Sequence, residues 1–542
     1  MSTGAAVPAS RPASARRVGA APSSVAAVPP HAPLHGTDLV LGTLALSLAT
    51  FMNVLDSSIA NVSIPAIAGD LGVSPAQGTW VITSFGVANA ISVPLTGWLT
   101  QRFGAVRLFT MSVLLFVLTS WLCGFASSLE SLVVFRVAQG LVAGPLIPLS
   151  QTLLLASYPR AKAGTALALW GMTTLVAPVV GPLAGGWITD NVSWPWIFYI
   201  NVPVGLVAAA LTWSIYKKRD TPIRKLPIDT VGLSLLVLWV GALQLMLDKG
   251  KELDWFASNQ IIVLAIVAVV AFAVFVVWEL TDEHPVVDLS LFSGRNFGFG
   301  SLAMAIAYGL FFANIVLLPL WLQQWMGYTA TAAGMALAPV GLLAILLTPL
   351  VGRKIAVWDP RIMASCAFVG FALVLYLRSQ FTTDTDFMHI MIPTIMQGAA
   401  VSFFFIPLTT LTLAGLTPDR IPAAAGLSNF TRITAGAMGT SIATTLWENR
   451  AAMHHAHLTE PMVQGQGPFA ATMDMLRSAG MSAEQVMWQI NRMIDQQAYT
   501  RAADDIYLVS SGLFLLLIAM LWLTRRPARA PTGAGAAASG AH

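Results

Sequence analysis

Charged residues are scarce in this chain of 542 residues, since Asp, Glu, Lys and Arg together make up only 10%. Soluble globular domains carry about 25%. Hydrophobic residues account for 56% of the chain, and the mean hydropathy is +0.71. The net charge of +4 gives no indication of nucleic-acid binding. This composition excludes an ordinary soluble protein and predicts an integral membrane protein, with the lipid bilayer as its surroundings.

Cysteine is also scarce, because Cys123 and Cys366 are the only two in the chain. Each lies in a separate apolar run, so we interpret both as small core residues rather than as a disulfide or metal ligands. The sequence also lacks a phosphate-binding loop, a His-Glu-x-x-His motif and a Gly-x-Ser-x-Gly motif. An enzyme is therefore not indicated, and we expect neither a cofactor nor a bound metal.

Long apolar runs are what the chain has instead. A helix needs about 20 mainly apolar residues to cross a bilayer, and 14 runs meet that condition. The predicted spans lie near 39–63, 78–99, 106–126, 131–156, 163–188, 196–216, 229–247, 260–280, 299–321, 330–351, 360–378, 387–414, 422–446 and 506–524.

The positions of Lys and Arg indicate how these spans are oriented. Of the 29 Lys and Arg residues, 20 fall in the segments on the side of the two termini, seven on the other side, and two, Arg136 and Arg432, within spans. Arg378 is among the seven. Because positive residues favour the cytoplasmic side, we expect both termini in the cytoplasm.

Three weak internal matches, in the same order, indicate a repeat of six spans. RVAQGLVAGPLIP (136–148) is echoed by IMQGAAVSFFFIP (395–407), for example. We therefore predict an all-α membrane protein with a six-helix bundle at 38–218, a linker with two inserted helices at 219–295, and a second six-helix bundle at 296–526 that includes an outside loop at 448–505. The Ala- and Pro-rich ends, 1–37 and 527–542, are expected to be disordered cytoplasmic tails. Two such halves are typical of secondary transporters.

Asp56 lies near the middle of the first span, where a charge is costly and usually functional. Arg136 is the only fixed cation that we place at membrane depth in the N-terminal half. A nearby guanidinium favours the ionised carboxylate, so one proton would change the net charge of the pair. Two interpretations remain open: a proton-coupling pair, or an ion pair that only fixes helix packing.

The stretch WGMTTLVAPVVGPLAGGWITD (170–190) concentrates small and helix-bending residues in one span. Glycines let helices approach closely and prolines kink them, so this span is either a pivot or a tightly packed helix. A second short motif, GWLTQRFG (97–104), follows the second span. The residues that we assign to conformational change are Gly97, Arg102, Gly104, Gly171, Pro178, Gly181, Pro182, Gly185 and Gly186.

These stretches resemble motifs of the major facilitator superfamily. The Gly-Pro-x-x-Gly-Gly core of 170–190 resembles its antiporter motif, and GWLTQRFG resembles its loop motif, except that Gln101 replaces the usual Asp. LDSSIANVSIP (55–65) resembles the first-span motif of the 14-helix drug:proton antiporters of the EmrB/QacA type. The resemblance implies the major facilitator fold and proton-coupled export of hydrophobic or amphipathic small molecules from a bacterial inner membrane. It also implies a periplasmic adaptor protein and an outer-membrane channel as partners.

Polar and aromatic residues at membrane depth are the candidates for substrate binding. Arg432 is interpreted either as the partner of an anionic substrate group or as the partner of a helix C-terminus. The full set of substrate-binding candidates is Asn61, Gln139, Trp170, Gln397, Phe404, Asn429 and Arg432. Export of a specific natural product or fatty acid, and a proton-coupled symporter, remain as alternative functions.

The segment before the last span has two features of its own. Residues 482–497 carry Val486, Ile490, Met493 and Ile494 at helical spacing, which predicts an amphipathic helix on the outer face that lies on the membrane or docks a partner. His454, His455 and His457 lie close together, either as a solvated run or as metal ligands.

Overall fold

The computed structural model describes residues 32–73, 75–159, 162–223, 227, 229–355, 357–463 and 468–526. Within these residues every regular element is a helix. The chain from Pro33 onward forms one compact unit. The predicted tails fall almost entirely outside the described residues.

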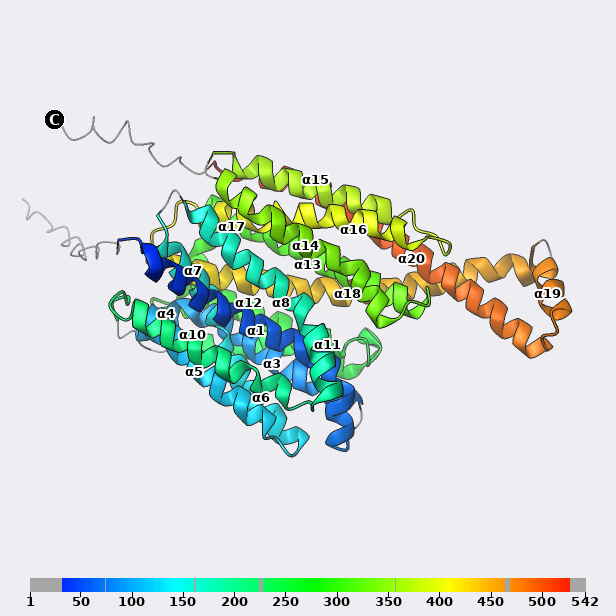
Figure 1. The fold of residues 1–542 in the computed structure, drawn as a ribbon, viewed down its shortest axis with the longest axis horizontal. Coiled ribbons are helices and arrows are strands. Elements are labelled where there is room, and N and C mark those ends of the chain that lie inside the picture. Colours follow the sequence, from blue (N-terminus) through cyan, green and yellow to red (C-terminus); the bar gives the residue numbers. More distant parts are fainter. Residues whose placement is uncertain are drawn as a thin grey trace, which may run out of the picture. The chain divides into compact units, whose positions relative to one another are not determined.

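The first half runs from α1 to α10 (Figure 1). Its predicted spans two, four and six are each built from more than one helix, because Pro94, the Gly144–Pro145 pair and Ile200 interrupt them. The elements are α1 (Gly36–Asp70), α2 (Pro75–Gly78), α3 (Trp80–Ser92), η1 (Val93–Leu95), α4 (Thr96–Phe103), α5 (Ala105–Gly124), α6 (Leu129–Ala143), α7 (Leu146–Ser157), α8 (Ala163–Asn191), α9 (Trp196–Tyr199) and α10 (Asn201–Tyr216).

The inserted pair and the second half follow in the predicted order. The inserted pair is α11 (Thr230–Lys249) and α12 (Asn259–Thr281), with the short turns η3 (Trp255–Ala257) and η4 (Leu289–Ser293). The second half contains α13 (Arg295–Gln324), α14 (Ala330–Lys354), α15 (Pro360–Arg378), α16 (Phe387–Ser402), α17 (Phe405–Thr412), α18 (Ile421–Val463), α19 (Pro468–Ser478) and α20 (Ala483–Leu521).

Twelve helical segments in the described part are long and apolar enough to cross a membrane. Helices α8 and α18, at predicted spans five and thirteen, are not among these twelve, although both are long enough. The structure is compatible with the count of 14, which remains a prediction.

The segment at 448–505 differs from the predicted loop. Helix α18 continues to Val463, and α20 begins at Ala483, so that α18, α19 and α20 form a helical hairpin at one end of the unit (Figure 1). Hydropathy missed the continuation of α18 to Val463, because it reports burial in a membrane rather than helicity. We call this end the hairpin end, and the opposite one, where α1 begins and α20 ends, the termini end.

Close packing of glycines joins matching helices in the two halves. A Cβ atom on Gly181 or Gly185 of α8 would lie within 3 Å of Ser58 or Ile59 of α1. In the second half, a Cβ atom on Gly439 of α18 would lie 2.3 Å from the carbonyl oxygen of Gly309 in α13. The repeated sequence therefore builds the same helix pair twice.

The halves contact each other at the termini end. A Cβ atom on Gly164 would lie 2.4 Å from the Gly352 carbonyl oxygen, and one on Gly97 would lie 2.6 Å from the Cβ of Ala423. Side chains larger than hydrogen would separate α8 from α14 at the first contact and α4 from α18 at the second. These glycines therefore allow the halves to close tightly here.

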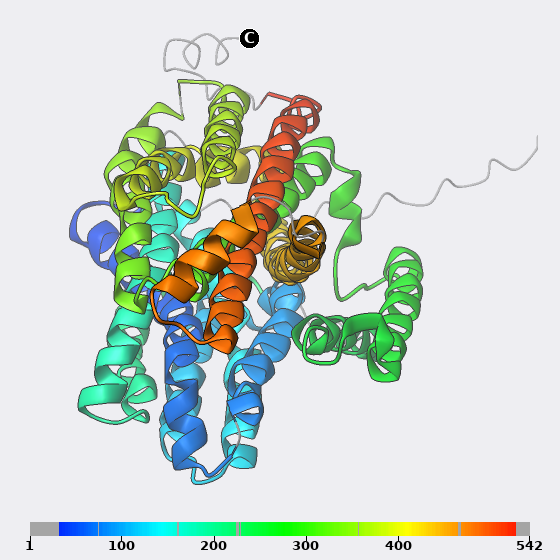
Figure 2. The ribbon, with the colours of Figure 1, turned by 90° about the vertical axis from the view of Figure 1, so that its right-hand side faces the viewer.

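The inserted helix α11 packs on both halves. Its Trp239 contacts Phe430 of α18 edge-to-face, at 5.6 Å between ring centroids. On its other side, Asp248 of α11 accepts a hydrogen bond from Thr83 of α3. Figure 2 shows the pair α11 and α12, in green, beside the rest of the unit. The inserted pair therefore covers one line of contact between the halves.

We expect Gly185→Ala to lower the unfolding temperature of the purified protein, because its methyl group would lie 2.8 Å from the Ile59 carbonyl oxygen. Overpacking of this kind costs about 1–3 kcal/mol. Gly171→Ala is the matched control, because its Cβ meets nothing within 4 Å and alanine favours a helix. Thermal unfolding in detergent measures both, and equal midpoints would contradict the packing argument.

Candidate functional site

A cluster of polar side chains surrounds Asp56 in the first half. Its Oδ2 accepts a hydrogen bond from Nη1 of Arg136 at 2.6 Å, and its Oδ1 accepts bonds from Gln139 at 3.2 Å and Asn201 at 2.9 Å. All four residues are buried, with Asp56, Arg136 and Gln139 fully so. The cluster thus joins α1, α6 and α10 through one carboxylate, and the predicted proximity of Asp56 and Arg136 is present.

The guanidinium of Arg136 is held on several sides. Its Nε donates to the carbonyl of Val81 at 2.9 Å, and its Nη1 also donates to Oε1 of Gln139 at 2.7 Å. The ring of Phe85 lies 4.2 Å from its central carbon. Because Arg stays protonated in proteins, a proton on Asp56 would leave this fixed cation without its counter-charge.

A hydrogen-bonded chain leads from α1 toward the second half. Thr50, six residues before Asp56, donates to Oγ of Ser150 at 2.7 Å, and Nε1 of Trp170 donates to the same oxygen at 3.1 Å. Ser150 lies on α7 and Trp170 on α8. The hydroxyl of Ser150 thereby connects α1 to the indole of Trp170.

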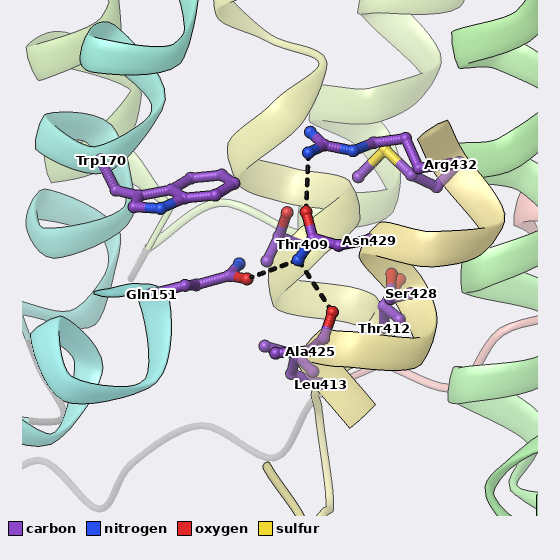
Figure 3. A pocket seen from close by; sticks show the side chains of 10 residues that line it. Gln151, Trp170, Thr409, Thr412, Leu413, Ala425, Ser428, Asn429 and Arg432 are labelled. Carbon is purple, nitrogen blue, oxygen red and sulfur yellow. Dashed lines mark hydrogen bonds between the residues drawn. The ribbon is translucent and has the colours of Figure 1, made fainter. Parts of the chain in front are cut away.

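Trp170 forms one wall of a small cavity between the halves (Figure 3). Gln151 of α7 and Asn429 of α18 face each other across it, and the amide of Asn429 donates to Oε1 of Gln151 at 3.3 Å. The cavity volume is about 10 Å³, which is room for about one water molecule and far below the size of sites for drug-sized ligands. Its lining residues are Gln151, Trp170, Met304, Thr409, Thr412, Leu413, Ala425, Ser428, Asn429 and Arg432.

Arg432 brings a cation into this cavity. Its Nη2 donates to Oδ1 of Asn429 at 2.6 Å, whereas its Nε has no hydrogen-bond partner among the described residues. Its central carbon lies 4.9 Å from the ring of Tyr308, with Trp170 and Phe405 within 6 Å. No carboxylate in the described part lies within 4 Å of it. Among the described residues, aromatic faces and the amide oxygen of Asn429 therefore provide the negative potential near this cation.

The predicted substrate-binding residues separate into two groups. Trp170, Asn429 and Arg432 line the cavity. Three others lie outside this cavity, and their role in substrate binding stays a prediction: Gln139 belongs to the Asp56 cluster, Gln397 accepts a hydrogen bond from Arg378, and Phe404 packs in the core of the second half. Asn61 lies in α1, but its side chain falls outside the described part.

Packing and hydrogen bonding explain why these three residues lie outside the cavity. A buried guanidinium needs uncharged acceptors as well as a counter-charge, and both glutamines supply one. Phe404 is fully buried because it packs against Phe368 and Phe371. Polar residues in the predicted spans do belong to buried hydrogen-bond networks. Their polarity alone does not show whether they line a cavity.

Several functional residues were not predicted. Asn201 was missed because it starts α10 beside polar loop sequence, and Tyr308 because a lone Tyr in an apolar span carries no motif. Gln151, Thr409 and Thr412 were also not among the predicted binding residues, although all three line the cavity.

The loop motif at 97–104 is completed by a residue from outside it. Gly104 adopts a left-handed backbone, with φ at 86°, that few other residues tolerate. Asp220, which follows α10, accepts a hydrogen bond from the amide of Val106 at 2.9 Å and lies 3.4 Å from Arg107. A carboxylate therefore reaches the start of α5 although the motif has Gln101. Arg102 lies over the ring of Trp98.

The span-five motif and the remaining candidates are also located. Gly171, Gly181, Gly185 and Gly186 all lie in α8, whereas the side chains of Pro178 and Pro182 fall outside the described part.

His454 pairs with Asp505, and His455 pairs with Asp495. The described residues contain no group of three or more metal ligands. Cys123 is buried as expected, but Cys366 is exposed on α15.

Comparisons with known proteins agree with this architecture. The Major Facilitator Superfamily profile matches residues 46–440. The chain is 53% identical to the multidrug export protein EmrB of Escherichia coli over 94% of this chain and 99% of that protein. It is 50% identical to the fatty acid resistance protein FarB of Neisseria gonorrhoeae over 91% of this chain and 98% of that protein.

Solved structures show the same fold at low sequence identity. The proton:xylose symporter XylE superposes with a TM-score of 0.54, at 13% identity, over 90% of this chain and 95% of that chain. The human organic anion transporter MFSD10 superposes with a TM-score of 0.55, also at 13% identity, over 90% of this chain and all of that chain. Together with the family profile and the EmrB-type relatives, these matches establish that the chain is a multi-pass membrane transporter of the major facilitator superfamily.

Proposed function

We propose that this protein exports hydrophobic and amphipathic small molecules by alternating access, in exchange for protons. The names of its relatives, a multidrug export protein and a fatty acid resistance protein, support export. The observation that carries proton coupling is the fully buried pair of Asp56 and Arg136, with its atoms 2.6 Å apart.

The proposed coupling follows from the net charge of this cluster. With Asp56 ionised, the pair is neutral and tolerated in an apolar interior. With Asp56 protonated, Arg136 carries an uncompensated charge, and the arrangement of helices with the lowest free energy is a different one. The proton thus selects between two conformations without entering the substrate cavity.

The chain Thr50–Ser150–Trp170 is the route by which the two sites influence each other. Movement of α1 changes the hydrogen bond that orients the indole, and the indole is one of the rings around Arg432. The cavity in this structure is small, so it has to widen to admit substrate. Separation of the halves at Gly97 and Gly164 is the movement that would open it from the termini end.

The charge of the cavity favours hydrophobic anions among the substrates. Arg432 has an Nε–H without a partner and no nearby acid in the described part, so an anionic head group would gain a charge-assisted hydrogen bond. Fatty acid export is therefore the second candidate function, which the name of the FarB relative also favours. Aromatic and methionine side chains suit the apolar remainder of such molecules.

The orientation that we propose places the termini end in the cytoplasm and the hairpin end outside, following the distribution of Lys and Arg. The apolar stripe that we predicted to lie on the membrane or dock a partner is used internally, because Val486, Ile490 and Ile494 pack against α18 and α19. A different face of the hairpin is exposed, with Met487 and Trp488 each more than half accessible. We assign this face to a periplasmic adaptor protein, which would connect the transporter to an outer-membrane channel.

Asp56→Asn is expected to abolish uphill export driven by a pH gradient, because the amide fixes the uncharged state. Exchange of substrate down its own gradient should continue. Proteoliposomes loaded with a fluorescent amphipathic dye measure both activities. Asp38→Asn, an exposed acid at the start of α1, serves as the control and should retain the wild-type rate. Uphill transport by Asp56→Asn would refute the assignment.

Arg432→Met is expected to weaken binding of tetraphenylborate about tenfold or more, since two opposite unit charges about 8 Å apart attract each other by roughly 2 kcal/mol at an effective dielectric constant of about 20. Tetraphenylphosphonium has the same shape and the opposite charge, and its binding should improve. Arg432→Lys keeps the charge and should lose less affinity. Calorimetry with the purified protein gives all these values, and equal effects on the two ions would exclude a charge-selective cavity.

Replacing Met487 and Trp488 together by Ser is expected to lower the drug resistance of whole cells while leaving transport in proteoliposomes unchanged. The reason is that both side chains point away from the hairpin's own core. Replacing the exposed Trp522, near the termini end, is the matched control and should leave resistance intact. Loss of transport in the purified protein would indicate a structural role instead.

A further inference from the structure

A second buried guanidinium lies in the other half of the protein without a counter-charge. Arg378 ends α15 and is fully buried, although its sequence position predicted an outside loop. Its Nη2 donates to Gln397 at 2.7 Å and to Thr394 at 3.2 Å, while its Nε and Nη1 have no partner among the described residues. A buried cation without a counter-charge is strongly destabilising. An acid that is ionised in another state of the protein would supply that counter-charge.

The repeat relates this cluster to that of Asp56. In the first half, Oε1 of Gln139 accepts from Arg136 at 2.7 Å, and in the second half Oε1 of Gln397 accepts from Arg378 at the same distance. Each glutamine precedes the glycine of a Gln-Gly pair. The first cluster includes a carboxylate, and the second has none within 4 Å in the described part. The missing component is therefore an acid.

Asp504 of α20 lies at the right level to be that acid. Ser511 of α20 donates to the carbonyl of Ala372, and Gln497 donates to Thr383, beyond the end of α15. These contacts fix the antiparallel register, in which residue 504 lies level with residues 377 and 378. Asp504 also continues the helical stripe of Thr500, Tyr507, Ser511 and Phe514, whose other members are all buried.

Tyr507 of α20 interacts with both the acid and the cation. It is 1% exposed, its hydroxyl group has no hydrogen-bond partner among the described residues, and it interacts electrostatically with both Arg378 and Asp504. Oδ1 of Asp504 is buried and also lacks a partner in the described part. Two packed helices, α15 and α20, therefore carry three polar groups with unused hydrogen-bonding capacity, and Tyr507 is the one that interacts with both of the others.

The other charged groups near Asp504 are few. On α20 itself these are Arg501 and Asp505. From α18, Arg450 and His454 contact Asp505 rather than Asp504. The neighbouring part of α13 presents the uncharged side chains of Trp321 and Asn314, and Trp321 donates to Thr500. Arg378 is thus the one charge that α15 adds from the buried side.

We propose that Asp504 is a second proton-binding carboxylate, near the hairpin end of the C-terminal half, with Arg378 as its conditional partner through Tyr507. The ionised carboxylate takes a proton from solution and becomes a neutral acid, and when it releases that proton the negative charge again balances Arg378. Burial opposes the charged form of an acid and a nearby guanidinium opposes the neutral form, so such an acid exchanges its proton readily. The role in coupling rests on the proposed antiport, whereas proton binding itself does not.

The test counts protons bound by the purified full-length protein when a weakly buffered detergent solution is moved between about pH 9 and pH 6, above the range in which an ordinary Asp titrates. We expect Asp504→Asn to bind one proton fewer than the wild type. Asp474→Asn, an exposed acid on α19, should match the wild type. Equal counts for the wild type and Asp504→Asn would overturn the proposal.

The partnership with Arg378 has its own readout. Removing the guanidinium in Arg378→Gln should move the Asp504-dependent proton to higher pH, because the carboxylate loses the charge that favours it. Arg378→Lys retains the charge, keeps the measurement possible if the glutamine variant does not fold, and should show a smaller shift. Tyr507→Phe should also move the titration, and an unchanged midpoint in all three variants would overturn the pairing. None of these assays depends on transport, so failure of the Asp56 assignment would be seen separately.

Discussion

A fixed positive charge in an apolar interior must be balanced, and the contact of Arg136 with Asp56 is the interaction on which the rest of this structure depends. An unpaired charge in such a place costs several kcal/mol even after relaxation. The first half meets this cost by bringing α1, α6 and α10 together around one carboxylate. The helices are thereby positioned by a group that a single proton can neutralise.

The other two buried guanidinium groups solve the same problem differently. Arg432 is surrounded by aromatic faces and one amide oxygen in the cavity between the halves. Arg378 has two neutral acceptors and a tyrosine. Neither has an ion-pair partner in the described part, so each is suited to a negative charge that arrives during the cycle. In this account that charge is the substrate for Arg432 and ionised Asp504 for Arg378.

Sequence reasoning predicted most of the fold because periodicity and hydropathy report on it directly. The order of helices, the two halves, the inserted pair and a helix at 482–497 were all expected, whereas the proximity of Asp56 to Arg136 was inferred from the family resemblance and not from sequence spacing. The continuation of α18 to Val463 was not expected, because this exposed polar part of the helix has low hydropathy. The burial of Arg378 was also missed, since its place at the end of a span suggested a loop. Gln397 and Phe404, which were predicted to bind substrate, lie outside the cavity, because sequence does not show which face of a helix meets a cavity.

The central claim is that proton and substrate compete through Asp56. The most direct measurement is proton release when tetraphenylborate, which has no titratable group, binds the purified protein in weakly buffered detergent near neutral pH. The account predicts that substrate binding releases a proton from the wild-type protein and that Asp56→Asn releases none from this site. Undiminished release from Asp56→Asn, or no release from the wild type at any pH at which the ion binds, would contradict it.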